Sequence, residues 1–384
     1  MCSLIESALL QAGLRVGRYA SPHVEHITER ISTFGRPVEE HKLALMMLRA
    51  LDACEGARRA GTPGADATWF DVMTAAAFLL FKEAALDWIA LEVGLGGKSD
   101  STNVVNAEVA VVTNVELEHT EVLGASRDLI AREKVGILKP GGVLVTTLAE
   151  DDLAGRMLQD RADELRCPVV RTCPRPDATI EDINLGLVEA VLDQLGRRGL
   201  RTRRENGAGD PVGGWLLDHG TLARARLPGR MERFDVAWRD VGRDVVRTIP
   251  AILDGAHVPF NLQGVLRDLN RRPDLPPACI AIVALAADKD AAGFLAALSR
   301  HAATVLWTVA PGQNRSHAPE ELDALARSLG LKSEVEPEAI KAYRRGLELA
   351  SETGAWVLIT GSLYLVGALR RTVVGASLPK APDG

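Results

Sequence analysis

One apolar run in the sequence carries a carboxylate inside it and then breaks into glycines: Trp88-Ile-Ala-Leu-Glu-Val-Gly-Leu-Gly-Gly, continuing to Asn103. A continuous apolar run that ends in glycine is typical of a central strand in a parallel sheet, and such sheets bind ligands beyond the carboxyl ends of their strands. The run therefore predicts a buried strand with Glu92 near its end, followed by a loop that faces a ligand site.

A second strand and loop follow directly. Residues 107–113 form the next strand candidate, and the loop after them contains His119. A helix predicted over 126–138 includes Lys134, and a further strand is predicted over 143–147. A carboxylate and an imidazole at neighbouring strand ends suit a divalent cation, because Mg²⁺ prefers oxygen ligands and Mn²⁺ also accepts imidazole. From these residues alone, an ion-paired Glu92 and an ordinary loop histidine explain the pattern equally well.

Length and composition limit the remaining classes. A chain of 384 residues exceeds the usual size of a single core, which predicts two domains, and 47% hydrophobic with 25% charged residues is typical of a globular protein. The net charge of −6 argues against nucleic acid or an anionic membrane as the main partner. No apolar run approaches the roughly 20 residues of a membrane span. The five cysteines are scattered without a Cys-x-x-Cys pair, which favours a reducing cytoplasm and no structural zinc.

Three ordered segments, 91–104, 113–124 and 131–141, closely resemble the folylpolyglutamate synthase and dihydrofolate synthase family, a branch of the Mur-ligase superfamily. The resemblance implies that Glu92 and His119 hold Mg²⁺ and that Lys134 is carbamylated. A carbamate would turn an ammonium into an acidic oxygen ligand, and lysine shifts its pKa readily when it is buried. The alternative for Lys134 is an exposed helical lysine paired with a neighbouring acid.

The segment Tyr19-Ala-Ser-Pro-His23, followed by Glu29-Arg-Ile31, is similar to a family segment that borders the pterin site. The resemblance implies that Ser21 is a further metal ligand and that the substrate contacts the loop residues Pro22, His23 and Arg30. The residues themselves also allow a simple turn at Ser21-Pro22 and a surface ion pair for Arg30.

The segment Thr68-Trp-Phe-Asp71 resembles a family motif, Thr-x-Phe-Glu, that lies near the substrate cleft. The resemblance implies a substrate contact by Asp71, although the family has the longer acid there. We expect Thr68 to cap a helix and the aromatic side chains of Trp69 and Phe70 to pack in the core.

The later part of the chain carries the nucleotide motifs of the family. Leu227-Pro-Gly-Arg-Met-Glu232 resembles a Pro-Gly-Arg-x-Glu linker, which implies that Arg230 binds the nucleotide phosphates and that the domains are 1–224 and 225–384. Residues 151–210 have a helical pattern, in which Asn184 matches, loosely, an adenine-contacting asparagine. The loop Asp254-Gly-Ala-His257 resembles one whose Asp and His approach ATP.

The resemblance and the element pattern together predict an α/β fold. The first domain, 1–224, is expected to be a Mur-ligase-type domain with a mostly parallel sheet that binds ATP, Mg²⁺ and folate, and the second a Rossmann-like domain in which strands alternate with helices. In the family the first helix follows a strand and a phosphate-binding loop, whereas no Gly-x-x-x-x-Gly-Lys-[Ser/Thr] occurs in this sequence. We expect the natural protein to include that strand and loop, the alternative being a form without the phosphate site. The chain as written is expected to bind and turn over ATP poorly or not at all.

The implied function is an ATP-dependent amide ligase. It would add L-glutamate to folate or dihydropteroate through an acyl phosphate, with ATP as co-substrate, Mg²⁺ as cofactor and Lys134, Arg230 and His119 as catalytic residues. A cytoplasmic monomer is expected. Two alternatives stay open: another Mur-type ligase that acts on a cell-wall precursor, and a non-catalytic folate-binding protein.

Overall fold

The structure is a computed structural model that describes residues 1–204, 207–239, 246–313 and 315–378. Its contacts divide the chain into unit 1, Met1–Arg226, and unit 2, Leu227–Gly384, two residues from the predicted boundary. None of the helices in the described ranges is both long and apolar enough to cross a membrane. The five cysteines are free thiols.

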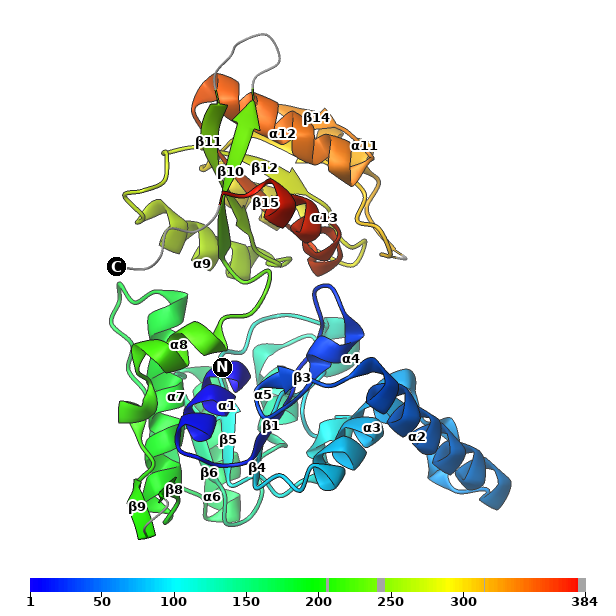
Figure 1. Cartoon of the computed structure of the whole chain (residues 1–384), viewed down its shortest axis with the longest axis vertical. Coiled ribbons are helices and arrows are strands. Elements are labelled where there is room, and N and C mark those ends of the chain that lie inside the picture. The colour runs from blue at the N-terminus through cyan, green and yellow to red at the C-terminus, as the bar shows by residue number, and fades with distance from the viewer. Residues whose placement is uncertain (205–206, 240–245, 314, 379–384) are drawn as a thin grey trace. The chain divides into compact units, whose positions relative to one another are not determined.

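Unit 1 contains eight of the labelled α-helices and nine of the strands in its described residues (Figure 1). In chain order these are α1 (Cys2–Gln11), β1 (Val16–Tyr19), β2 (Ile31–Thr33), β3 (Arg36–Pro37), α2 (Glu40–Ala60), α3 (Trp69–Glu83), β4 (Trp88–Leu91), β5 (Val109–Val112), α4 (Thr120–Leu123), α5 (Arg127–Val135), β6 (Val143–Thr146), α6 (Leu153–Leu165), β7 (Val169–Arg171), α7 (Ile180–Arg197), β8 (Arg201–Arg204), β9 (Gly207–Pro211) and α8 (His219–Ala225). Short 3₁₀ turns occur at Ile27–Arg30, Pro63–Asp66, Ser101–Val104 and Gly214–Leu216.

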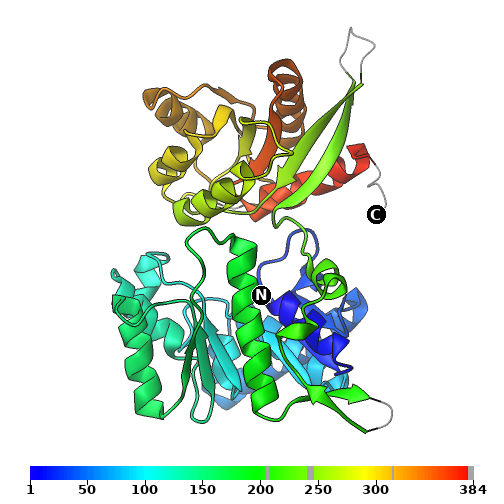
Figure 2. The ribbon, with the colours of Figure 1, turned by 90° about the vertical axis from the view of Figure 1, so that its left-hand side faces the viewer.

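Two sheets of unit 1 carry the strand ends that the sequence singled out. One has the order β3-β2-β1-β4, in which β1 and β4 are parallel, and the other is the parallel sheet β5-β6-β7. Helix α1 packs on β1 and β4, while α7 packs on β5 and β6, as Figure 2 shows for α7. Val16, Val145 and Leu187 belong to one apolar core shared by both sheets, so this core holds β4 and β5 in one unit.

Two further helix layers complete unit 1. Helices α2 and α3 cover the first sheet through a core that contains Tyr19, Ile31 and Met73, and α5 and α6 cover the second through a core built around Ile130 and Leu158. Apolar side chains recur at helical spacing on the inward faces of these helices, which is why each helix buries one face only. The loops after β1, β4 and β5 are thereby supported from both sides.

A buried ion pair joins α1 to β1. The guanidinium of Arg18 donates from Nε to Oε2 of Glu6 at 3.0 Å, and both side chains are less than one tenth exposed. The hydroxyl of Ser32 donates to the other oxygen of Glu6. Burial of two charges is tolerated here because each is hydrogen-bonded, and the pair fixes the strand that leads to Ser21.

Unit 2 is a six-stranded sheet with helices on it, in the order β10-β11-β15-β12-β13-β14. Within the described part of this sheet, only the β10–β11 pairing is antiparallel, and the other pairings are parallel. Its elements are β10 (Glu232–Arg239), β11 (Val246–Leu253), α9 (Pro259–Asn270), β12 (Cys279–Val283), α10 (Ala291–Leu298), β13 (Ala302–Trp307), α11 (Pro319–Ser328), β14 (Ser333–Val335), α12 (Ala339–Thr353), β15 (Trp356–Thr360) and α13 (Leu363–Ala376). The central strands β12 and β15 are entirely buried, as expected where helices cover both faces.

The α/β prediction is confirmed, but the pattern over 151–210 was interpreted incorrectly in part. The sequence predicts a helical pattern over 151–210 and a flexible tip over 206–214, of which residue 206 lies outside the described residues. The structure contains strand β7 and the antiparallel strands β8 and β9 besides two helices. The arginine-rich segment 201–204 has no apolar face of its own to reveal a strand. Segment 201–204 is a strand because it pairs with β9, and composition alone does not reveal such a pairing.

Replacing Arg18 by Met is expected to lower the free energy of unfolding of unit 1 by about 3–5 kcal/mol, because Glu6 would keep a buried charge without its cation. Arg58→Met is the control, since the Arg58–Glu55 pair is exposed at 64% and 50% and is worth less than about 1 kcal/mol. Urea unfolding followed by fluorescence measures both. Equal effects of the two changes would contradict a stabilising role for the buried pair.

Candidate active site

Ser21 and Glu92 lie together at the carboxyl ends of the parallel strands β1 and β4. The backbone N–H of Ser21 donates to Oε2 of Glu92 at 3.2 Å, and the N–H of Glu92 donates to the carbonyl of Tyr19 at 2.9 Å. The register of the two strands pairs Tyr19 with Leu91, which brings the following residues side by side. The structure thus brings together the two residues Ser21 and Glu92 through the Ser21 backbone, and Glu92 is exposed.

The glycine loop after Glu92 packs directly on helix α5. A Cβ atom on Gly97 would lie 2.6 Å from the carbonyl oxygen of Glu133 and 2.8 Å from that of Lys134. The N–H of Lys98 donates to the same Glu133 carbonyl at 2.9 Å. Only glycine allows this approach of two backbones. The contact places the loop from one sheet against the helix that carries Lys134.

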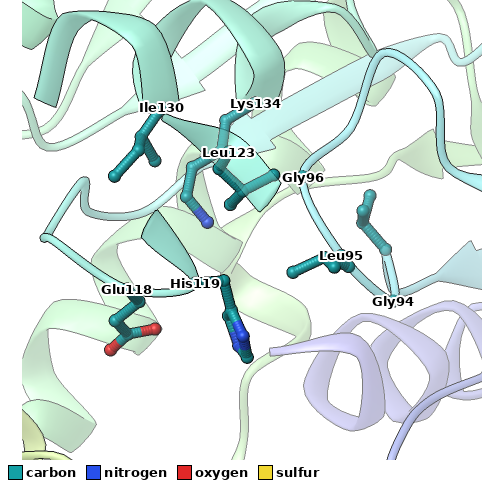
Figure 3. A pocket seen from close by; sticks show the side chains of 9 residues that line it. Gly94, Leu95, Gly96, Glu118, His119, Leu123, Ile130 and Lys134 are labelled. Carbon is teal, nitrogen blue, oxygen red and sulfur yellow. The ribbon is translucent and has the colours of Figure 1, made fainter. Parts of the chain in front are cut away.

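A pocket of about 150 Å³ opens between this loop and the loop after β5. His119 and Lys134 line it together with Leu95 and Gly96 of the glycine loop, as Figure 3 shows. His119 has a left-handed backbone, φ 51°, and stands at the N-terminal end of the short helix α4. Lys134 is half-buried in the pocket wall, so the structure does not support the alternative of a lysine on an exposed helix face.

The predicted ligands of this site would suit a hard divalent cation if Lys134 carried a carbamate, which supplies an oxygen ligand. Among the described residues no three or more His, Cys, Asp and Glu side chains form a metal-binding group. The predicted set contains only two such side chains, Glu92 and His119, completed by the Ser21 hydroxyl and Lys134. As an ammonium Lys134 would repel a cation, whereas a carbamate at the same position would attract one.

The predicted substrate residues His23 and Arg30 form a cluster with Trp69. Nε of Arg30 donates to Nδ1 of His23 at 2.9 Å, and the guanidinium carbon of Arg30 lies 5.0 Å from the centre of the Trp69 ring. Partial burial, and secondarily the charge of Arg30, lowers the pKa of His23. Neutral His23 accepts at Nδ1 and therefore carries its proton on Nε2. Pro22 is exposed beside this cluster.

Trp69 corrects the expectation that both aromatic residues are core residues. Phe70 packs against the core that contains Tyr19, but Trp69 is 50% exposed. Its face is occupied by the Arg30 guanidinium rather than by apolar side chains, an attraction that the sequence pattern does not reveal. The exposed indole and the partly buried guanidinium stacked on it offer a planar surface.

Asp71 is tied into local structure. Its Oδ2 accepts from the N–H and hydroxyl of Thr68, which closes the predicted N-terminal cap of α3, and its Oδ1 accepts from the Ser101 hydroxyl at 2.5 Å. The Ser101 bond, and then those from Thr68, lower the pKa of Asp71. The cap prediction is confirmed, while a substrate contact by Asp71 stays a prediction.

In unit 2 the nucleotide motifs converge on one loop. Both oxygens of Asp254 are used by backbone donors, Met231 N–H at 2.8 Å and Ala256 N–H at 2.9 Å, and the side chain is only 6% exposed. Burial raises the pKa of Asp254 against the effect of these bonds. Nδ1 of His257 lies 2.9 Å from the Gly255 carbonyl, so it donates there and leaves Nε2 available. Arg230 is exposed, and its Nη1 is 3.0 Å from where a Gly255 Cβ would lie.

Asn184 lies in the second turn of α7 and is partly buried. The sequence analysis did not identify the ion pair between Glu232 and Arg370. The two side chains form a bidentate pair with N–O distances of 2.8 and 2.7 Å. Glu232 belongs to the linker motif, but its partner stands 138 residues later. No local pattern could have identified that partner.

Comparison with known proteins places this site in a family. Residues 229–363 match the Mur ligase, glutamate ligase domain. The chain is 33% identical over 313 residues to the dihydrofolate synthase/folylpolyglutamate synthase of Escherichia coli, an alignment that covers 77% of this chain and 66% of that protein. The chain belongs to the folylpolyglutamate synthase and dihydrofolate synthase family. It thus spans about two thirds of the length of that relative, and the family predicted from the three ordered motifs is confirmed.

Solved structures of family members have the same fold. The folylpolyglutamate synthase of Mycobacterium tuberculosis, complexed with ADP, superposes with a TM-score of 0.79 at 23% identity, covering 100% of this chain and 88% of that one. The bifunctional folylpolyglutamate synthase/dihydrofolate synthase of Yersinia pestis, complexed with AMPPNP and Mn ion, gives a TM-score of 0.75 at 27% identity, covering 97% and 85%. The predicted two-domain Mur-ligase architecture is therefore confirmed.

Replacing Gly97 by Ala is expected to lower the free energy of unfolding of unit 1 by about 1–3 kcal/mol, because the methyl group would collide with two fixed backbone carbonyls. Gly56→Ala is the matched control: no atom lies within 4 Å of its Cβ position in the interior of α2. That change should raise the stability by about 0.5–1 kcal/mol. Urea unfolding curves test both signs, and a stable Gly97→Ala variant would refute the close contact.

Proposed function

We propose that this chain is an ATP-dependent ligase that joins L-glutamate to a folate or dihydropteroate carboxylate. Two observations support the proposal in a chain that belongs to this family: Ser21 is hydrogen-bonded to Glu92 at the start of the glycine loop, and the same loop lines one pocket with His119 and Lys134. The family relatives complexed with ADP or with AMPPNP and Mn ion support a nucleotide and a divalent cation as the other components. A cytoplasmic monomer is part of the proposal.

Ser21, Glu92, His119 and a Lys134 carbamate would hold the cation, which we propose to be Mg²⁺. When bound, it would neutralise charge on the nucleotide phosphates. Mostly oxygen ligands favour Mg²⁺, and one imidazole among them is compatible with Mn²⁺ as well. Lys134 lines the pocket, so a carbamate formed on its amine would present an anionic oxygen to the proposed cation.

The chemistry proceeds in two steps. A carboxylate oxygen of the pteroate or folate attacks the γ-phosphorus of ATP, ADP leaves, and an acyl phosphate forms. The amine of glutamate then attacks the acyl carbon; the C–N bond forms as the bond to phosphate breaks, and a proton leaves the nitrogen. The first step is required because a free carboxylate is a poor electrophile, and water must be excluded because it would hydrolyse the acyl phosphate.

The two ends of the substrates are assigned to different residues. Arg230, with a planar guanidinium suited to phosphate oxygens, is assigned with His257 to the nucleotide, together with Asn184 for the adenine. Asp254 belongs to the same loop, where its buried carboxylate holds the backbone. Pro22, His23, Arg30 and Asp71 are assigned to the pterin-bearing acid, an assignment supported by the exposed Trp69 ring that stacks on Arg30.

The deciding assay incubates the protein isolated from its native source, alongside the 384-residue chain, with ATP, Mg²⁺, dihydropteroate or folate, and one labelled amino acid. We expect the isolated protein to incorporate label from L-glutamate, with equimolar ADP released. Incorporation of alanine or diaminopimelate into a cell-wall precursor would instead favour the other Mur-type ligases. Folate binding without ATP consumption would favour a non-catalytic role.

The cation site predicts a specific defect. Glu92→Gln and His119→Ala should each raise the Mg²⁺ or Mn²⁺ concentration needed for half-maximal activity by about 10²-fold, because each removes a proposed ligand. Glu121→Gln is the control, since Glu121 is exposed on α4 outside the residues that line the pocket. Activity titrated against the cation measures the shift, and unchanged cation dependence in Glu92→Gln would remove it from the ligand set.

The carbamate can be tested separately from activity. Incubation with ¹³C-bicarbonate should give a carbamate signal in the ¹³C NMR spectrum that is absent from a Lys134→Met variant. A signal that persists in Lys134→Met would assign the carbamate to another amine.

A further inference from the structure

The Arg230 loop of unit 2 has an unusual backbone that is held by several separate bonds. Gly229 and Met231 both have left-handed backbones, with φ of 62° and 47°. For methionine that conformation is unfavourable, so the surroundings must stabilise it. The residue between them, Arg230, is the exposed guanidinium that the proposed function assigns to the nucleotide.

Two carboxylates hold this loop from opposite sides. Asp254 accepts from the N–H of Met231 at 2.8 Å, and Glu232 accepts from the N–H of Gly229 at 2.9 Å. The carbonyl of Gly229 in turn accepts from the N–H of Gly255 at 3.1 Å. Every one of these bonds involves the backbone directly before or after Arg230, so together they determine where its side chain starts.

Glu232 is itself fixed by Arg370 of helix α13. The two side chains make a bidentate pair, Nε to Oε2 at 2.8 Å and Nη2 to Oε1 at 2.7 Å, and each is only about one fifth exposed, at 21% and 22%. Bidentate geometry restricts the rotation of both groups, unlike a single exposed contact. Helix α13 packs on β10, which begins at Glu232 (Figure 1).

We infer that Glu232 and Arg370 are positioning residues that hold the Arg230 loop in its nucleotide-binding conformation. Arg370 acts through Glu232 on the Gly229 N–H and never needs to touch the nucleotide. The inference rests on the proposed function for the role of Arg230, while the hold on the loop rests on the contacts alone. It assigns a part in nucleotide binding to a residue on the last helix of the described chain.

The experiment compares Arg370→Gln with Arg345→Gln in the full chain. Arg345 makes a bidentate pair of similar length with Glu334, at 2.9 and 3.1 Å, between α12 and β14, although its side chains are more exposed, at 40% and 42%. Hydrogen exchange measured by mass spectrometry on peptides spanning 227–233 is expected to accelerate in Arg370→Gln and stay unchanged in Arg345→Gln. Unchanged exchange in Arg370→Gln would overturn the inference whatever the protein's activity.

The effect of Arg370 on nucleotide binding is tested by measuring the affinity for ADP. Titration with ADP and Mg²⁺ should show roughly three- to tenfold weaker binding in Arg370→Gln, with partial recovery in Arg370→Lys. The same change added to Arg230→Ala should weaken binding no further, because Arg370 acts only through Arg230. Additive losses would overturn the positioning role. If the unsubstituted protein isolated from its native source binds no ADP at all, the proposed function fails, and the exchange data still decide whether Arg370 holds the loop.

Discussion

The contact between Gly97 and the last turns of α5 is the constraint on which the site in unit 1 depends. Glu92 and Ser21 follow strands of one sheet, while His119 and Lys134 belong to the loop and helix around another. No strand pairing links β4 to β5 among the described residues, so their relative position depends on the shared core and on this backbone contact. A side chain at residue 97 would push the carboxylate loop off the helix that carries the lysine.

A loop of unit 2 is also held in one conformation, but by hydrogen bonds to carboxylates rather than by close packing. This loop has two left-handed residues. Burial raises the pKa of Asp254. Ionising this side chain inside the protein therefore lowers the free energy of unfolding at pH values above the ordinary pKa of an aspartate. The pKa of Asp254 is higher in the folded than in the unfolded protein, so the free energy of unfolding falls as the pH rises from the unfolded-state pKa to the folded-state pKa. The two backbone hydrogen bonds offset that cost, and the loop gains one defined conformation in return.

Local signals in the sequence predicted the parts of the site that are local in space. The strand before Glu92, the glycines after it and the Thr68 cap were each identified from a few neighbouring residues, and the structure contains them. The expectation that this strand is central and buried is wrong: β4 stands at the end of its four-stranded sheet in the described residues, and only Ala90 in it is fully buried. The exposed position of Trp69 and the Glu232–Arg370 pair were not identified, because each depends on a partner from a distant segment. The hairpin β8–β9 was missed for a related reason: its strands are polar, so pairing and not burial defines them.

The backbone contact at Gly97 and the carboxylate hydrogen bonds on the Arg230 loop differ in how well they tolerate amino-acid substitution. A backbone contact such as that of Gly97 has no softer substitute, because any Cβ meets carbonyl oxygens that belong to a hydrogen-bonded helix. The carboxylate hold on the Arg230 loop can be weakened in steps, since Arg370 reaches the loop through Glu232 and Asp254 holds it independently. Geometry at the proposed cation site is thus fixed by the chain's shape, whereas geometry around Arg230 is adjustable through side chains remote from it. Sequence change that tunes nucleotide affinity while retaining the cation site is therefore expected to occur on α13 and β10 rather than in the glycine loop.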